Sequence, residues 1–236
     1  MKATYLTKVP IYLIFLMVYQ LGFSQKTAKV ELPLIYDFDY IYKLKMTHKK
    51  GDMTLDYYLK EDGKYFGFDS EEMSKGSEDT KMFMIMDAGL EITAMFIEVM
   101  GKKVVQKTKL KASDFDADDD DMSNYTFTEI DSKTINGYEC DGFVSENDKM
   151  KITYYITDDV PLSFSQVFGS NIKNMPKGFN TSLMKKYAEN GLMMEMIFED
   201  KKKSKNNMTM QCTGLEKVDF SIDTTKYGSM MSAFGG

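Results

Sequence analysis

Arginine is missing from this sequence, so all 30 of its basic residues are lysines, and 36 acidic residues outnumber them. Proteins that bind nucleic acids usually present a basic face and use the forked hydrogen bonding of the guanidinium group. The chain has neither feature. Its composition therefore excludes nucleic acid as a partner.

Histidine is almost missing as well. The single histidine, His48, stands between Thr47 and Lys49 at the end of an expected strand, where we interpret it as an exposed turn residue. A Ser-His-Asp triad or a histidine metal cluster needs more partners than this chain offers. No histidine lies near a cysteine in the sequence, and no glycine-rich phosphate loop is present. We therefore expect a protein that is not an enzyme and that carries no cofactor.

Cysteine occurs twice, as Cys140 and Cys212. An oxidising compartment would allow the two to pair, and we predict that disulfide. The alternative is two separate buried thiols, because cysteine often serves as a small core residue. The sequence does not determine whether the two Cα atoms lie within the distance of about 7 Å that a disulfide needs.

Residues 1–25 have the pattern of a secretory signal peptide. They contain Lys2, Lys8 and no acid, then an apolar run at 11–21, then small and polar residues before Gln25. A membrane anchor is the alternative, but the run is shorter than the roughly 20 residues that a spanning helix needs. No cysteine near the cleavage site could take a lipid. We expect an exported, soluble protein of the periplasm or the extracellular space, not lipid-anchored.

The remainder of the chain, residues 26–236, contains no linker rich in Pro, Gly or Ser, so we predict a single domain. Loss of residues 1–25 changes the formal net charge from −6 to −8, because it removes two lysines and no acid. From Asp39 onward, apolar and polar residues alternate between tight turns, which is typical of antiparallel strands. The pair Asn136-Gly137 favours a hairpin turn.

The densest apolar stretch after residue 25 is 81–104, KMFMIMDAGLEITAMFIEVMGKKV. In a strand, Met82, Met84 and Met86 point to one face and Phe83 and Ile85 to the other, so both faces need cover. We predict a strand, a turn at Asp87-Ala88-Gly89 and a returning strand. The alternative is a helix over residues 87–101, with Asp87 as its N-cap and Gly101 just past its end.

Six acidic residues lie between Asp114 and Asp121. A calcium-binding EF-hand loop needs glycine at its sixth position and glutamate at its twelfth, and no starting position here provides both. We therefore expect residues 111–124 to form a solvated acidic loop whose charges repel one another.

The pattern changes at residues 160–190, where Pro161 and partly helical apolar spacing predict a helical or irregular insert. Residues 228–236 are expected to form a frayed tail. The fold class is therefore mainly β: about ten strands form a large curved antiparallel sheet or half-barrel, with one or two helices on its concave side. Curling around a helix would leave an apolar hollow.

Two sequence blocks carry a resemblance to a known family. TINGYECDGF at 134–143 leads to KMKITYYITDDVPL at 149–162, and MIMDAGLEITAMFIEVMGKKV occupies 84–104. Together they resemble the secreted family named domain of unknown function 4412, typical of the Bacteroidetes cell envelope. The resemblance implies the half-barrel of the periplasmic lipoprotein carriers, and with it a role facing lipid. The arginine that those carriers use has no counterpart here, so the resemblance does not extend to lipoprotein transfer.

Methionine is abundant, with 21 residues, several of them spaced as Met-x-Met. Methionine fills irregular cores and lines adaptable apolar surfaces. We predict an apolar hollow that holds a lipid or acyl chain and is lined by Met82, Met84, Met86, Met95, Phe96, Phe164 and Phe168. The first alternative is Cu(I) or Ag(I) bound by Met82, Met84 and Met86, since thioethers are soft ligands. The second is a structural envelope protein without a ligand, whose partners are other envelope proteins.

Overall fold

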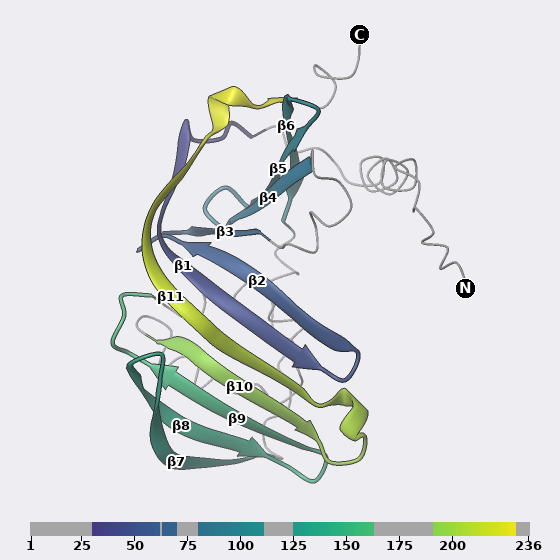
Figure 1. Cartoon of the computed structure of the whole chain (residues 1–236), viewed down its shortest axis with the longest axis vertical. Helices are drawn as coiled ribbons and strands as arrows, with labels where there is room; N and C mark the ends of the chain where they lie inside the picture. Colours follow the sequence, from purple (N-terminus) through teal and green to yellow (C-terminus); the bar gives the residue numbers. More distant parts are fainter. Residues whose placement is uncertain (1–29, 62, 70–79, 111–124, 163–190, 230–236) are drawn as a thin grey trace, which may run out of the picture.

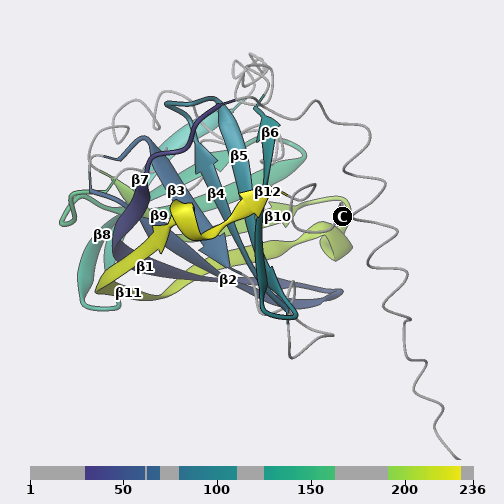
Figure 2. The same ribbon diagram turned by 90° about the horizontal axis from the view of Figure 1, so that it is seen from above.

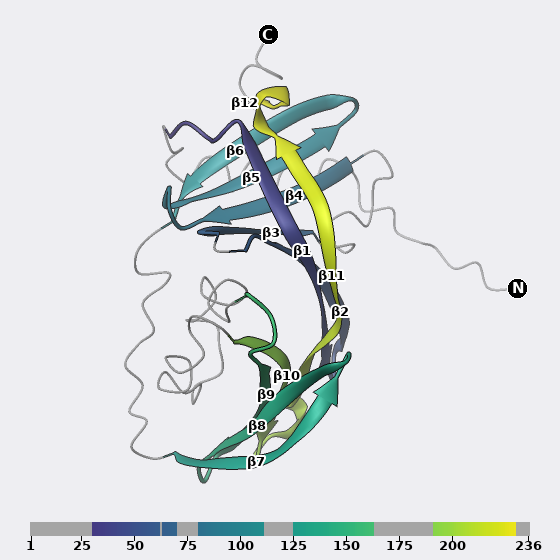
Figure 3. The same cartoon turned by 90° about the vertical axis from the view of Figure 1, so that its left-hand side faces the viewer.

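The structure is a computed structural model, and it describes residues 30–61, 63–69, 80–110, 125–162 and 191–229. These residues form one sheet of 12 strands, curved as Figures 1 and 3 show. The strands are β1 (Ile35–His48), β2 (Gly51–Leu59), β3 (Tyr65–Asp69), β4 (Thr80–Asp87), β5 (Ile92–Val99), β6 (Lys102–Lys109), β7 (Thr126–Ile135), β8 (Tyr138–Glu146), β9 (Met150–Thr157), β10 (Leu192–Asp200), β11 (Met208–Asp223) and β12 (Gly228–Ser229).

Neighbouring strands pair in the order β12-β6-β5-β4-β3-β2-β1-β11-β10-β9-β8-β7. Every pair is antiparallel except β12 with β6. The mainly β, curved antiparallel architecture predicted from the alternating pattern is confirmed. Figure 2 shows β12 alongside β6, where Gly228 lies opposite Val104. The predicted frayed tail was therefore wrong at its first two residues, which add a short strand to the sheet.

No α-helix occurs among the described residues, which contain only the 3₁₀ turns η4 (Ser204–Asn206) and η5 (Thr224–Lys226). The helices predicted on the concave side are not seen there. Within the same residues, no helix is long and apolar enough to span a membrane. The signal peptide at 1–25, the acidic loop at 111–124 and most of the insert, at 163–190, lie outside the described residues.

Two long strands, β1 and β11, pair along nearly their whole length in the middle of the sheet (Figure 1). In β1, alternate residues are buried from Tyr36 to Leu44, as expected for a strand with one covered face. The register between the strands shifts between Phe38 and Tyr40 and again between Lys43 and Leu44. Such irregularities bend and twist a strand pair, which lets β1 and β11 follow the curve of the sheet.

The sheet has a hydrophobic core on each side of its β2–β4 region. The main core includes Tyr40, Tyr42, Leu44, Tyr57, Leu59, Phe66, Tyr154, Met194 and Met196. The second core consists of the buried residues Tyr36, Phe38, Ile85, Ala94, Phe96 and Ile222. In β2, Tyr57 and Leu59 belong to the main core, whereas Tyr58 between them packs against the second core. The expectation that both faces of the stretch 81–104 need cover is met only in part: Ile85 is buried on one face of β4, whereas Met82, Met84 and Met86 on the other face are half-buried.

The lower half of the molecule in Figure 3 curls until its outer hairpin meets the central strands. In the β7–β8 turn, the side-chain amide of Asn136 donates a hydrogen bond of 2.7 Å to the carbonyl oxygen of Cys212 on β11. In the sheet order, three strands, β10, β9 and β8, separate β7 from β11. Asn136 and Gly137 have φ of 51° and 86°, which confirms the predicted tight hairpin turn.

The stretch from Asp87 to Gly101 is a turn followed by strand β5, so the predicted strand is confirmed over its helical alternative. Asp87 is nevertheless a cap: its Oδ1 accepts a hydrogen bond of 2.8 Å from the backbone N–H of Leu90. The β-branched and aromatic residues of this stretch favour a pleated strand over a helix.

Cys140 and Cys212 are free thiols and both are buried, so the predicted disulfide is not formed. They lie on β8 and β11, which do not pair. Each thiol instead lies 3.4 Å from a carbonyl oxygen two residues away, that of Tyr138 for Cys140 and that of Gly214 for Cys212. Burial raises the pKa of both thiols to about 11.

Candidate functional site

A row of aromatic and methionine side chains crosses the sheet from β2 to β5. The strand registers place Tyr57 opposite Phe68, Phe68 opposite Met84, and Met84 opposite Met95. Directly opposed residues of antiparallel strands share one face, with Cβ atoms about 4.5–5.5 Å apart. The row therefore forms a continuous apolar strip on the same side of the sheet as the main core.

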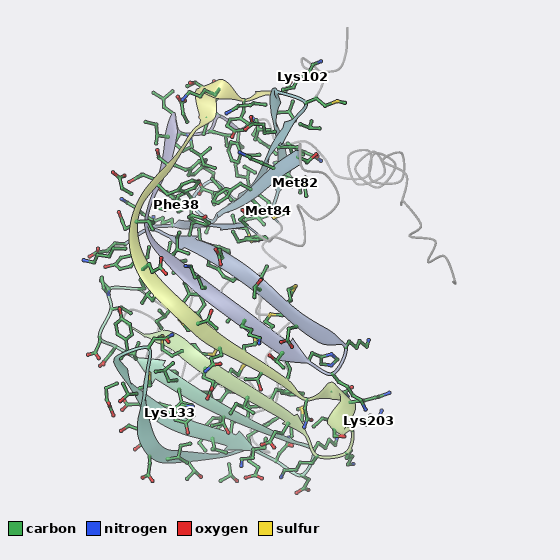
Figure 4. The ribbon with its side chains drawn as sticks, in the orientation of Figure 1. Phe38, Met82, Met84, Lys102, Lys133 and Lys203 are labelled. Atoms are coloured by element: carbon green, nitrogen blue, oxygen red, sulfur yellow. The ribbon has the colours of Figure 1, made fainter. Side chains whose placement is uncertain are left out.

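Met82 and Met86 lie on either side of Met84 on this face, two residues away along β4. We call the set of Phe68, Met82, Met84, Met86 and Met95 the methionine face. Figure 4 shows Met82 and Met84 on β4, in the half of the molecule opposite Lys133. All five side chains are half-buried, in contrast to the fully buried Met194 and Met196 of the main core.

The methionine face begins at the main core and extends away from it. Phe68 and Met86 pack against the main core, and the ring of Phe68 lies 6.0 Å from that of Tyr57. Met82, Met84 and Met95 are not among the described residues that pack into either core. This part of the face keeps apolar area accessible, because these three methionine side chains are only half-buried.

The chemistry of the methionine face is apolar and adaptable. It contains no ionisable group, and next to it burial raises the pKa of the Tyr57 phenol to about 12, so that side chain is neutral. The described residues contain no group of three or more His, Cys, Asp or Glu side chains that could hold a metal ion. The thioether side chains can adapt to apolar groups of varied shape, and neither thioethers nor the Phe68 ring offer strong hydrogen bonds.

The sequence-predicted site residues divide into three groups. Met82, Met84 and Met86 share one face of β4, as predicted, and the register places Met95 opposite Met84 on the same face. Phe96 does not join them: it follows Met95 in β5, so it points to the opposite side, where it is 2% exposed in the second core. Phe164 and Phe168 lie outside the described residues.

Sequence reasoning missed Tyr57 and Phe68 as members of the row. Their alternation with neighbours indicated which residues share a face within each strand. It could not show that β3 lies between β2 and β4 with Phe68 aligned on Met84, because that alignment depends on the pairing register.

The fold and this face define a mainly β protein with a curved, open and mostly antiparallel sheet and an accessible apolar strip. The family model described as domain of unknown function (DUF4412) matches residues 38–222, and the chain belongs to that family. This confirms the resemblance carried by residues 84–104 and 134–143.

Solved structures offer more distant likenesses. An uncharacterised conserved protein from Thermus thermophilus is 7% identical, with 83% of this chain and 88% of that chain covered and a TM-score of 0.42. A putative outer membrane lipoprotein-sorting protein domain from Vibrio parahaemolyticus is 10% identical, with 76% and 85% covered and a TM-score of 0.27. PNGF-II is 10% identical, with a TM-score of 0.37. The match covers 81% of this chain but only 30% of the PNGF-II chain.

Since the TM-scores are 0.42, 0.27 and 0.37, these likenesses carry no conclusion about function. Among curated proteins, none matches this chain.

Proposed function

We propose that this protein is a non-enzymatic, exported protein of the cell envelope that binds an apolar ligand, such as a lipid acyl chain, on the methionine face. The observation that supports the proposal is the row Phe68–Met84–Met95, which is apolar, continuous and only half-buried. Contiguous exposed apolar surface on a protein commonly marks a ligand or partner site. The signal-peptide pattern of residues 1–25 supports the proposed location.

The sulfur-rich character of the face suits chains that vary in length and unsaturation. Methionine has three rotatable bonds and a polarisable sulfur, so its side chain adjusts to the shape of its neighbour. The apolar body of the ligand would supply the binding free energy, at roughly 25 cal/mol per Å² of buried apolar surface. The absence of charge on the face favours the hydrocarbon part of a lipid over its head group.

The test is binding of cis-parinaric acid, a fluorescent fatty acid, to the purified protein. We expect saturable binding by the wild type. The double variant Met84→Gln/Met95→Gln should weaken it by about tenfold or more, because two buried amides cost at least about 1.4 kcal/mol relative to thioethers. Met100→Gln is the matched control, since Met100 is 85% exposed in the β5–β6 turn. Equal affinity of the double variant and the control, or no binding by the wild type, would refute the proposal.

Cu(I) binding is the second candidate, and the directly opposed Met84 and Met95 are the observation that favours it. Two thioethers facing each other across a strand pair could share a soft ion. Native mass spectrometry of the exported protein, purified without detergent, separates the candidates. Co-purified lipid supports the apolar ligand. A bare protein that takes up one equivalent of Cu(I), and loses that uptake in the double variant, supports the metal. A protein that does neither would be a structural envelope protein.

A further inference from the structure

A pocket of about 320 Å³ opens beside β1 and β11, at a distance along the sheet from the methionine face. Its walls include Tyr40 on β1, Leu215 on β11, Tyr138 at the start of β8 and Val160 in the segment after β9. The curl that brings the β7–β8 turn onto β11 also brings Tyr138 toward Leu215. The volume is at the lower end of the range of about 300–1,000 Å³ for small-molecule sites.

The inner part of this pocket is apolar and firmly held. Tyr40 and Val160 are each only 6% exposed and belong to the main core. Tyr138 and Leu215 are half-buried and pack against that core. A ligand that entered would therefore meet two tyrosine side chains and two aliphatic ones on a rigid base.

The rim of the pocket is charged, with a negative excess. Glu61 and Asp159 are exposed carboxylates, and Lys217 is the cation. The Nζ of Lys217 lies over the ring of Tyr40, 5.7 Å from its centroid. An ammonium group is attracted to the face of an aromatic ring at such distances. The protein's own lysine thus shows that the Tyr40 ring accepts a cation at the pocket.

We propose that this pocket binds a small organic cation: a primary or quaternary ammonium group carried on a short apolar body. The ammonium group would lie between the rim carboxylates and the tyrosine rings, and the apolar body would contact Val160 and Leu215. Lys217 then competes with the ligand, and its flexible side chain swings into solvent when the ligand binds. The pocket uses none of the residues of the methionine face, so this inference is independent of the proposed function.

Ligands of other charge fit the same walls less well. An anion would gain from Lys217 alone and would meet two carboxylates, whereas like charges repel. A neutral molecule of the same shape would keep the contacts with Val160 and Leu215 but gain nothing from the rim. Ligands of the same shape but different charge should therefore bind the pocket with different affinities, the cation most tightly.

The experiment compares three probes with the same tert-alkyl shape: choline, the uncharged 3,3-dimethylbutan-1-ol and the anionic 3,3-dimethylbutanoate. Each is titrated into the full-length protein, and binding is followed by NMR line broadening and calorimetry at low ionic strength. We expect choline to bind most tightly, the alcohol more weakly and the carboxylate most weakly. No binding of choline, or tighter binding of the carboxylate, would overturn the proposal.

Variants at the rim give effects of opposite sign. Glu61→Gln and Asp159→Asn should each weaken choline binding by about two- to fivefold, the range of exposed charge pairs. Lys217→Gln removes the competing cation, so it should strengthen choline binding by a similar factor. Asp148→Asn, an exposed carboxylate in the β8–β9 turn, is the charge-matched control and should change nothing. Weaker choline binding by Lys217→Gln would contradict the competition and with it the proposed site.

Discussion

At the scale of single residues, Tyr36 and Asp87 form a buried hydrogen bond that joins β1 to β4. The Tyr36 hydroxyl donates to Asp87 Oδ2 at 2.9 Å, and the two residues are 0% and 5% exposed. Burial first, and then the hydrogen bond to Asp87, hold the pKa of Tyr36 well above its ordinary value, so the phenol keeps its proton and remains the donor. The other carboxylate oxygen caps the turn at Leu90.

Tyr36→Phe should destabilise the protein by about 1–3 kcal/mol, because it leaves a buried carboxylate oxygen without its donor. The free energy of unfolding in urea is the measurement. Tyr65→Phe is the matched control: the Tyr65 hydroxyl donates to the carbonyl oxygen of Asp37 at 3.0 Å, but at an exposed site, so water can replace it. If Tyr36→Phe lowered the free energy of unfolding by no more than Tyr65→Phe does, the buried hydrogen bond to Asp87 would not contribute as proposed.

At the scale of elements, β3 crosses the second core at a point where only glycine fits. A Cβ on Gly67 would lie 2.5 Å from Cε1 and Cζ of Phe83. The Phe83 ring cannot easily move, since its centroid lies 5.8, 5.0 and 5.4 Å from the rings of Phe38, Tyr58 and Phe220. Phe83 lies on β4, and the three surrounding rings come from β1, β2 and β11. Side chains of four strands therefore pack against Gly67 of β3 at this point.

Gly67→Ala should therefore destabilise the protein by about 1–3 kcal/mol through overpacking. Thermal and urea unfolding would measure the loss, and the near-ultraviolet circular dichroism of the aromatic cluster should change as well. Gly214→Ala is the control, because a Cβ there would make only ordinary contacts, with the nearest atom at 3.4 Å. Equal stability of the two variants would show that the Phe83 ring can move aside to accept the Cβ atom, and would contradict the prediction.

At the scale of the whole molecule, the main core joins strands from both ends of the described sequence and buries several groups that release protons at alkaline pH, among them Cys140, Cys212, Tyr42 and Tyr57. Burial raises the pKa of Cys140 and Cys212 from 9.0 to about 11 and that of Tyr57 from 10.0 to about 12. The unfolded chain loses these protons at lower pH than the folded protein does. The stability they contribute is therefore complete below pH 9 and is lost as the pH rises toward 12.

We expect the free energy of unfolding to fall steadily between about pH 9 and pH 12, measured in urea at fixed ionic strength. In the double variant Cys140→Ala/Cys212→Ala, the part of this fall contributed by the thiols should disappear, leaving a shallower slope below pH 11. An unchanged slope in that variant would mean that the thiols do not contribute.

Strand content and several turns could be predicted from the sequence because their causes are local. Period-two alternation in β1 and the dense apolar run of β4 each follow from side chains pointing alternately to opposite faces. The hairpin at Asn136-Gly137 follows from the positive φ that these residues tolerate. The same local rule placed Met82, Met84 and Met86 together on one face, and it should also have separated Phe96 from Met95.

The partners of each strand were decided only by the tertiary structure. The pairing of β1 with β11 places Ile35 opposite Asp223, and no local sequence pattern around either residue predicts this partner. The same long-range pairing aligned Phe68 and Met95 with Met84, left Cys140 and Cys212 apart as free thiols, and assembled the pocket at Tyr40. Register is a property of two strands at once, so a pattern within one strand determines which face a residue takes but not what lies beside it.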